Sequence, residues 1–168
     1  MKHVSLKVRR KARKIKLLLL DVDGVLTDGG IYIDNRGVET KRFDVRDGQG
    51  ITLLQRAGIE VGFITGRFSE VVRFRAKELG VRIVYQKVQK KLEAYQRIKQ
   101  KSRLEDESIA YIGDDVADIA VLRQTGLAVA VRDAWAEVKR HADYVTEADG
   151  GRGAVREVSE LLLKAQTS

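Results

Sequence analysis

The sequence of 168 residues contains no cysteine and no proline. Without cysteine, the protein has no disulfide, no thiol nucleophile and no cysteine-based metal site. Its apolar runs are far shorter than the roughly 20 residues that a membrane-spanning helix requires. The basic N-terminal segment also lacks the apolar stretch and the small-residue cleavage site of a signal peptide. We therefore expect a cytoplasmic protein with no membrane partner.

Acidic residues are missing from the first 16 positions, which hold eight of the 32 lysines and arginines. The other 24 basic residues balance the 24 acidic ones, so the formal net charge of +8 belongs entirely to this N-terminal arm. Such a run would suit a nucleic-acid-binding tail. However, Val4, Val8, Ala12 and Ile15 recur at helical spacing, and no aromatic residue is interleaved for base stacking. We interpret residues 1–16 as a basic amphipathic helix and expect no nucleic-acid partner.

Hydrophobic residues make up 43% of the chain, which is enough for one folded domain over residues 1–168. Short β-prone segments alternate with helical segments, a pattern typical of a parallel sheet covered by helices on both faces. The predicted fold class is α/β, with a doubly wound parallel sheet. The predicted strands are Leu17–Leu20, Ile59–Ile64, Val81–Tyr85, Ile109–Ile112, Leu127–Ala130 and Tyr144–Val145. The predicted helices include one ending at Gly58, one from Ser69 to Leu79, and Lys90–Lys101, Val116–Gln124 and Trp135–Arg140.

Two further segments stand out. Within residues 29–45, the β-prone Ile31–Ile33 and Val38–Phe43 flank a turn-rich break at residues 34–37, which predicts a β-hairpin. Charged residues on its strands indicate that part of the hairpin is exposed or packs on another subunit. Residues 149–168 combine a glycine-rich tail with a final helix that has one apolar face.

Two carboxylates, Asp21 and Asp23, follow the buried strand Leu17–Leu20, where open α/β sheets collect ligands. A calcium loop is excluded, because its fifth and sixth positions would be Val25 and Leu26 instead of an oxygen ligand and a glycine. Either the carboxylates cap a turn, or Asp21 is the nucleophile of a phosphoryl-transfer site and Asp23 handles protons. Two unit charges ~4 Å apart repel by ~4 kcal/mol at an effective dielectric constant of about 20, so a phosphoryl-transfer site needs positive charge nearby.

Other predicted strand ends carry groups that favour phosphoryl transfer. Thr65 follows one strand, and Asp114 and Asp115 follow another, while Lys91 at a helix start can reach the same edge. Thr65 and Lys91 can supply the hydrogen bond and the positive charge that phosphoryl oxygens require. Carboxylates and a carbonyl form the hard oxygen set that Mg²⁺ prefers. The predicted magnesium ligands are Asp21, Asp23 through its backbone, and Asp114.

In this order, the motifs resemble those of the haloacid-dehalogenase superfamily of phosphatases: a strand followed by Asp-x-Asp-Gly, a Thr at a strand end, a Lys and a Gly-Asp-Asp segment. The resemblance implies that Asp21 attacks phosphorus and that Asp23 protonates the leaving oxygen and later activates water. It also implies that Thr65 and Lys91 hold the phosphoryl group while Asp114 binds Mg²⁺. A phospho-acceptor signalling domain is an alternative of a different class, although its acidic residues occur in another order; catalytic turnover would distinguish the two.

The intervals before Ile64 and before Lys91 leave no room for the cap domain that most superfamily members carry. A bare site is wet, so the substrate or another subunit should cover it. The segments Asp21–Gly29, Phe43–Gly48, Tyr111–Asp115 and Gly150–Glu157 resemble those of the 3-deoxy-D-manno-octulosonate 8-phosphate phosphatases. That resemblance implies a capless homotetramer of lipopolysaccharide synthesis, a phosphorylated sugar acid as substrate, and sites that a neighbour's hairpin or tail completes. Phosphatases of sialic-acid-type 9-phosphates share the scaffold and remain an alternative.

The predicted substrate-binding residues are Gly66, Arg67, Arg75 and Arg152. Arg67 and Arg75 lie eight residues apart, about two helical turns, so both could face the crevice. Their guanidinium groups can pair bidentately with a carboxylate or a phosphate. Three glycines in residues 150–153 suggest a mobile segment, which we expect to move over an active site so that Arg152 neutralises bound substrate. Asp115 and Asp118 are left without a role.

Overall fold

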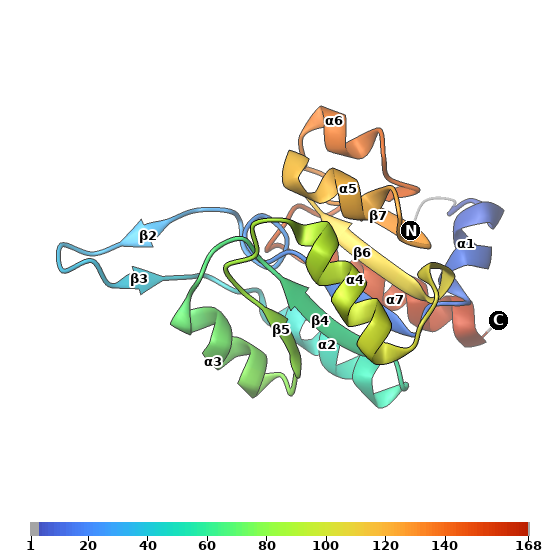
Figure 1. Ribbon diagram of the computed structural model, residues 1–168, viewed down its shortest axis with the longest axis horizontal. Coiled ribbons are helices and arrows are strands. Elements are labelled where there is room, and N and C mark those ends of the chain that lie inside the picture. Colours follow the sequence, from blue (N-terminus) through green and yellow to red (C-terminus); the bar gives the residue numbers. More distant parts are fainter. Residues whose placement is uncertain (1–3, 168) are drawn as a thin grey trace.

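The computed structural model describes residues 4–167, whose centre is a six-stranded parallel sheet with the order β5-β4-β1-β6-β7-β8 (Figure 1). β1 lies inside the sheet, and all four of its leucines are buried. It pairs with β4 on one side and with β6 on the other. The chain therefore builds the sheet in both directions from β1, as predicted for a doubly wound fold. The strands are β1 (Leu17–Leu20), β4 (Glu60–Ile64), β5 (Ile83–Tyr85), β6 (Ile109–Gly113), β7 (Leu127–Ala130) and β8 (Tyr144–Val145).

Helices cover both faces of the sheet. α2 packs against α7 and α7 against α1 on one face, while α4 contacts α5 on the other (Figure 1). The buried apolar side chains of the described residues form one cluster. No helix within residues 4–167 is both long and apolar enough to span a membrane. The helices are α1 (Leu6–Ala12), α2 (Val45–Arg56), α3 (Glu70–Glu78), α4 (Lys91–Ser102), α5 (Ile119–Leu122), α6 (Ala136–Lys139) and α7 (Ala154–Thr167), with 3₁₀ turns at Asp106–Ser108 and Val116–Asp118.

The basic N-terminal arm forms a helix, as predicted, over the part that the structure describes; residues 1–3 of the predicted arm lie outside it. Val4, Val8, Ala12 and Ile15 are buried, and they form the predicted apolar face. Several cations of the arm are paired: Lys11 Nζ donates to Asp143 Oδ2 at 2.5 Å, Lys14 Nζ to Glu107 Oε2 at 2.7 Å, and Arg13 Nε to the carbonyl of Ala165 at 3.2 Å. Part of the arm's charge therefore fixes the helix to the domain.

The predicted hairpin is present, but its paired strands are only β2 (Tyr32–Ile33) and β3 (Glu39–Thr40). It extends away from the main sheet (Figure 1). Ile31, Ile33 and Val38 are 61%, 60% and 55% exposed, because no other element within residues 4–167 covers the hairpin. A two-stranded ribbon without a covering element gains little from pairing, which explains why its ladder is shorter than the β-prone sequence suggested.

The prediction of one continuous helix over Val116–Gln124 is wrong. A 3₁₀ turn over Val116–Asp118 precedes the short α5. The cause is Asp118, whose Oδ2 accepts the N–H groups of Asp114 at 3.0 Å and Asp115 at 3.1 Å. Because these bonds point the backbone of residues 114 and 115 inward, they tighten the first turn after β6.

Candidate active site

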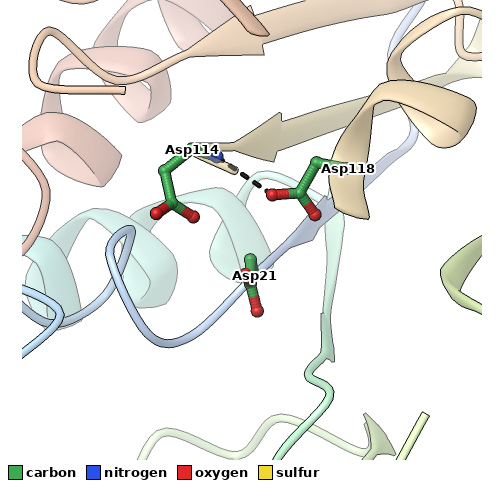
Figure 2. Close-up of side chains that lie close together, drawn as sticks. All are labelled: Asp21, Asp114 and Asp118. Atoms are coloured by element: carbon green, nitrogen blue, oxygen red, sulfur yellow. Dashed lines mark hydrogen bonds between the residues drawn. The ribbon is translucent and has the colours of Figure 1, made fainter. Parts of the chain in front are cut away.

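Asp21, Thr65 and Asp114 follow the carboxyl ends of β1, β4 and β6, which are neighbouring parallel strands. Parallel pairing places these strand ends on one edge of the sheet, as the sequence predicted. Figure 2 shows Asp21 and Asp114 turned toward the same space, with Asp118 beside them. One carboxylate oxygen from each of these three residues lies within 4.8 Å of the others, so the group can hold a metal ion.

Lys91 links two of these carboxylates. Its Nζ donates to Asp21 Oδ2 at 2.6 Å and to Asp118 Oδ1 at 2.7 Å, and its side chain is only 6% exposed. Burial by itself would lower the pKa of Lys91, but the charges of Asp21 and Asp118 raise it above the ordinary value. Burial raises the pKa of Asp21 to about 6, although the charge of Lys91 opposes this shift. Lys91 therefore remains a cation beside Asp21.

Asp118 is fully buried and has four hydrogen bonds. Besides the two backbone N–H groups on Oδ2, its Oδ1 accepts from Lys91 and from the hydroxyl of Tyr111 at 2.5 Å. With its acceptor positions occupied in this way, Asp118 orients Lys91 and the backbone of Asp114. Sequence reasoning left it without a role. A signal for its structural role was present in the sequence, because Asp115 and Asp118 have the three-residue spacing of a capping box. The structure contains both hydrogen bonds of that motif.

Asp114 has the opposite environment. Its Oδ1 is buried and has no hydrogen-bond partner among residues 4–167. Burial and the charges of Asp21 and Asp118 raise the pKa of Asp114 to about 8. A buried carboxylate oxygen without a partner is costly unless a cation binds it. The donor set consists only of hard oxygens, so the residues present fit a magnesium ion.

The position directly after Asp23 must be a glycine, and the structure shows the reason. The backbone of Gly24 has φ +90°, and a Cβ there would lie 2.0 Å from Asp114 Oδ2. Any larger residue would push Asp114 away from Asp21. The Asp-x-Asp-Gly pattern thus joins a strand end to a turn that must pass directly beside the third carboxylate.

Asp23 meets cations from two other segments. Lys41 Nζ donates to Asp23 Oδ1 at 2.5 Å, and Arg67 Nη1 lies 3.8 Å from the same oxygen. Lys41 follows β3, but its side chain is only 1% exposed. Nothing in the local sequence distinguishes Lys41 from the exposed charges of the hairpin, since its partner is 18 positions away in the chain.

The structure brings Thr65 and Arg67 close to these groups. Thr65 is buried, and its Oγ1 accepts the N–H of Arg67 at 3.3 Å. Arg67 Nη2 donates to Glu39 Oε1 of the hairpin at 2.6 Å. Gly66 lies between them, and a Cβ there would come no closer than 3.6 Å to the carbonyl of Val88. A side chain at position 66 would therefore meet no close neighbour among the described residues, so packing alone does not require glycine there.

The helical spacing on which we expected Arg67 and Arg75 both to face the crevice is not present. α3 begins at Glu70, so Arg67 lies in the preceding loop and the helical spacing does not apply. Arg75 Nη1 donates to Glu78 Oε2 at 2.8 Å, and its guanidinium lies 5.6 Å from the centre of the Phe43 ring. These contacts hold Arg75 beside Phe43 and not in the cluster of carboxylates.

The glycine-rich tail packs against the loop that follows Asp21. The N–H of Gly151 donates to the carbonyl of Val25 at 2.8 Å, and Arg42 Nη1 donates to the carbonyl of Gly151 at 3.0 Å. A Cβ on Gly150 would lie 1.8 Å from the oxygen of Gly24. Gly150 and Gly151 are thus explained by close packing within one chain, and not only by conformational freedom as the sequence suggested.

The side chain of Arg152, by contrast, is exposed. The N–H of Gly30 lowers the pKa of Asp28, and the nearby charge of Arg152 contributes to the same shift. Arg152 therefore lies close to the loop between Asp23 and the hairpin.

A family model of haloacid dehalogenase-like hydrolases matches residues 74–157. The chain is 50% identical over 163 residues to the 3-deoxy-D-manno-octulosonate 8-phosphate phosphatase KdsC of Escherichia coli K12, covering 97% of this chain and 87% of that protein. A crystal structure of this phosphatase from Yersinia pestis superposes with a TM-score of 0.97 at 47% identity, covering 98% of this chain and 89% of that one. The enzyme from Moraxella catarrhalis, solved with magnesium, phosphate and KDO, gives a TM-score of 0.94 at 43% identity, covering 96% of this chain and 92% of that one.

The sheet, the carboxylate cluster and these similarities define a haloacid dehalogenase-like hydrolase. Within this class, the chain belongs to the family of the 3-deoxy-D-manno-octulosonate 8-phosphate phosphatases. The family model begins at residue 74, so it does not include Asp21, Asp23 or Thr65. The matches to whole-chain relatives are what extend the similarity to the segment with Asp21 and Asp23.

Proposed function

We propose that this protein is a magnesium-dependent phosphatase that releases phosphate from 3-deoxy-D-manno-octulosonate 8-phosphate, an activity that serves the synthesis of lipopolysaccharide precursors. The observation that carries the proposal is the 50% identity to KdsC over nearly the whole chain. The cluster of Asp21, Lys91 and Asp114 supports it, since a phosphomonoesterase needs a nucleophile, a cation for the phosphoryl group and a metal site.

In the proposed first step, a carboxylate oxygen of Asp21 bonds to phosphorus as the bond from phosphorus to the sugar oxygen breaks. Asp23 gives its proton to that leaving oxygen. In the second step, Asp23 takes a proton from a water molecule, whose oxygen bonds to phosphorus. The bond between Asp21 and phosphorus then breaks, which releases phosphate and restores both carboxyl groups.

Lys91 and Thr65 hold the phosphoryl group during both steps. The ammonium of Lys91 already lies 2.6 Å from Asp21 Oδ2, so it can offset the negative charge of an arriving phosphate. Asp21, Asp114 and the backbone of Asp23 would hold the magnesium ion. When bound, this ion supplies the additional positive charge that lets an anionic nucleophile approach an anionic phosphate.

Arg67 is proposed to bind the sugar carboxylate, together with the backbone at Gly66 and with Arg152 from the tail. A guanidinium group suits a carboxylate, because its fork of N–H donors matches the two oxygens. Arg75 would have to exchange its pairing with Glu78 for the substrate to take part in this binding. We further propose that residues 1–168 act as one catalytic domain in the cytoplasm, with small phosphorylated sugar acids and not nucleic acids as partners.

A homotetramer is the assembly that we propose, with hairpins and tails of neighbouring subunits completing each site. The exposed Ile31, Ile33 and Val38 support this proposal, because exposed apolar side chains that gather on one ribbon favour association. Size measurement in solution, with the unaltered protein and with an Ile31→Ser, Ile33→Ser variant, tests it. A monomeric unaltered protein would contradict the assembly without affecting the proposed chemistry.

The decisive experiment is a phosphate-release screen with and without Mg²⁺. We expect catalytic turnover, with the highest kcat/KM for 3-deoxy-D-manno-octulosonate 8-phosphate. Preference for a sialic-acid-type 9-phosphate would replace the proposed substrate but keep the reaction. A stable phospho-Asp21 without turnover would instead indicate a phospho-acceptor domain.

A further inference from the structure

The ammonium group of Lys41 is a buried charge of the hairpin that the proposed chemistry does not use. It lies 2.5 Å from Asp23 Oδ1 and 3.4 Å from Glu39 Oε1, and the side chain is 1% exposed. A lysine is rarely buried to this extent, because removal of the ammonium from water is costly unless paired anions compensate for it. Both of its partners are acidic residues, and one of them is Asp23.

The direction of this side chain follows from the strand. Residues two apart on an extended segment point to the same side, so Glu39 and Lys41 face one way and Thr40 and Arg42 the other. Glu39 contacts Arg67 at 2.6 Å, and Arg42 contacts the carbonyl of Gly151 at 3.0 Å. One short segment thus holds Asp23 and Arg67 on one side and the tail on the other.

We propose that Lys41 is a positioning residue for Asp23, and this inference rests on the phosphatase function proposed above. By binding Oδ1, Lys41 fixes the rotation of the carboxyl group and leaves Oδ2 as the oxygen that exchanges the proton. As this proton passes to the leaving oxygen and the bond to phosphorus breaks, Asp23 becomes negative. The ammonium 2.5 Å away stabilises that new charge, and this stabilisation is greater in the transition state than before proton transfer.

Glu39 completes the arrangement. Its carboxylate contacts both Lys41 and Arg67, so it keeps these two cations at a fixed separation on either side of Asp23. Without this anion, the two neighbouring cations would repel each other close to the carboxyl group that exchanges the proton. Glu39 and Lys41 therefore form part of the proton-transfer machinery.

The proposal has a specific kinetic consequence. A sugar or alkyl leaving group needs a proton as the bond to phosphorus breaks, whereas the oxygen of an acidic phenol can leave as an anion. If Lys41 acts through Asp23, its loss must slow alkyl phosphates much more than aryl phosphates. A merely structural role would slow both classes by the same factor.

The test compares Lys41→Met, Lys41→Gln and Lys41→Arg on 3-deoxy-D-manno-octulosonate 8-phosphate, on a simple alkyl phosphate and on 4-nitrophenyl phosphate, at saturating Mg²⁺. For the two neutral variants we expect kcat to fall at least about tenfold further on the alkyl substrates than on the aryl one. Lys41→Arg should recover most of the difference. Arg36→Met is the matched control, since Arg36 is an exposed cation of the same hairpin, and it should behave as the unaltered protein does.

A double variant separates this proposal from a general loss of order. Asp23→Asn should show the same dependence on the leaving group, and addition of Lys41→Met should cause little further loss on alkyl substrates, because the residues act as one unit. Equal losses on both substrate classes, or losses that multiply in the double variant, would overturn the role of Lys41.

Thermal unfolding of each variant identifies any that fails to fold, and Lys41→Gln then replaces Lys41→Met. If the unaltered protein did not hydrolyse the sugar phosphate, the proposed function would fail, while the comparison of alkyl and aryl phosphates would still test Lys41.

Discussion

The backbone of Gly150 lies so close to Gly24 that a Cβ on Gly150 would be 1.8 Å from the carbonyl oxygen of Gly24. Gly24 in turn leaves room for Asp114, because a Cβ on Gly24 would be 2.0 Å from Asp114 Oδ2. The tail, the loop after Asp21 and the third carboxylate are therefore packed in series. A change of shape in the tail should reach the metal site through this stack, since closely packed backbone cannot absorb it.

Gly150→Ala should loosen the tail. The methyl group has no space, so we expect a loss of roughly 1–3 kcal/mol in the free energy of unfolding and faster hydrogen exchange at residues 150–153. Gly58→Ala is the control, because Gly58 has φ +83° but no neighbouring atom within 4 Å. It should cost stability through backbone strain alone and leave exchange in the tail unchanged. Unchanged exchange in Gly150→Ala would show that the tail is not held by this contact.

Arg152→Ala should affect sugar recognition. Its exposed side chain near Asp28 contributes little to packing, so thermal stability should hardly change. We expect kcat/KM to fall at least about tenfold for the sugar phosphate, since a charged hydrogen bond contributes about 1.5–3 kcal/mol, and to fall much less for a small aryl phosphate. Equal effects on both substrates, or no effect on either, would mean that the tail does not recognise the sugar.

Asp21→Asn should abolish turnover and preserve the fold. An amide cannot form the phosphorylated intermediate, so we expect kcat to fall by at least about 10³. Because burial disfavours the charged form of Asp21 and raises its pKa to about 6, loss of that charge should leave the melting temperature equal or higher. Asp34→Asn, on the exposed hairpin, is the control for removal of a carboxylate. Activity within tenfold of the unaltered protein would exclude Asp21 as the nucleophile.

Removal of the metal should abolish activity and make stability depend on pH. The pKa of Asp21 is raised from 3.8 to about 6 and that of Asp114 from 3.8 to about 8. Between pH of about 4 and about 8, the folded metal-free protein therefore binds more protons than the unfolded chain does. Stability should therefore fall as the pH rises from about 4 to about 8. Mg²⁺ should bind more tightly toward pH 8, where Asp114 is deprotonated, and should remove most of this decline.

Thermal unfolding across this pH range, with a chelator and with added Mg²⁺, measures the effect. Asp114→Asn should show a smaller decline in the chelator, because the amide does not titrate. Full phosphatase activity in excess chelator would refute the metal site, and a stability that rises with pH in the metal-free protein would refute the proton linkage.

The sequence predicted the sheet and the positions of Asp21, Thr65 and Asp114 because these features depend on local pattern. Buried strands are recognised from short apolar runs, and a polar residue directly after such a run must lie at the edge of the sheet where neighbouring strands end. The apolar stripe of the N-terminal arm is equally local, and α1 confirms it over the described residues.

The contacts of Lys41 with Asp23, of Asp118 with Lys91 and of Gly150 with Gly24 could not be predicted in the same way, because these partners are distant in the chain. Lys41 resembles any charged residue of a hairpin until the fold brings it to Asp23, and Arg75 resembles a crevice residue until α3 is seen to begin after Arg67. Residue type and spacing thus determined which groups reach the edge of the sheet. Only the tertiary structure decided which charges are buried together, since desolvation and packing depend on atoms that the whole fold brings into contact.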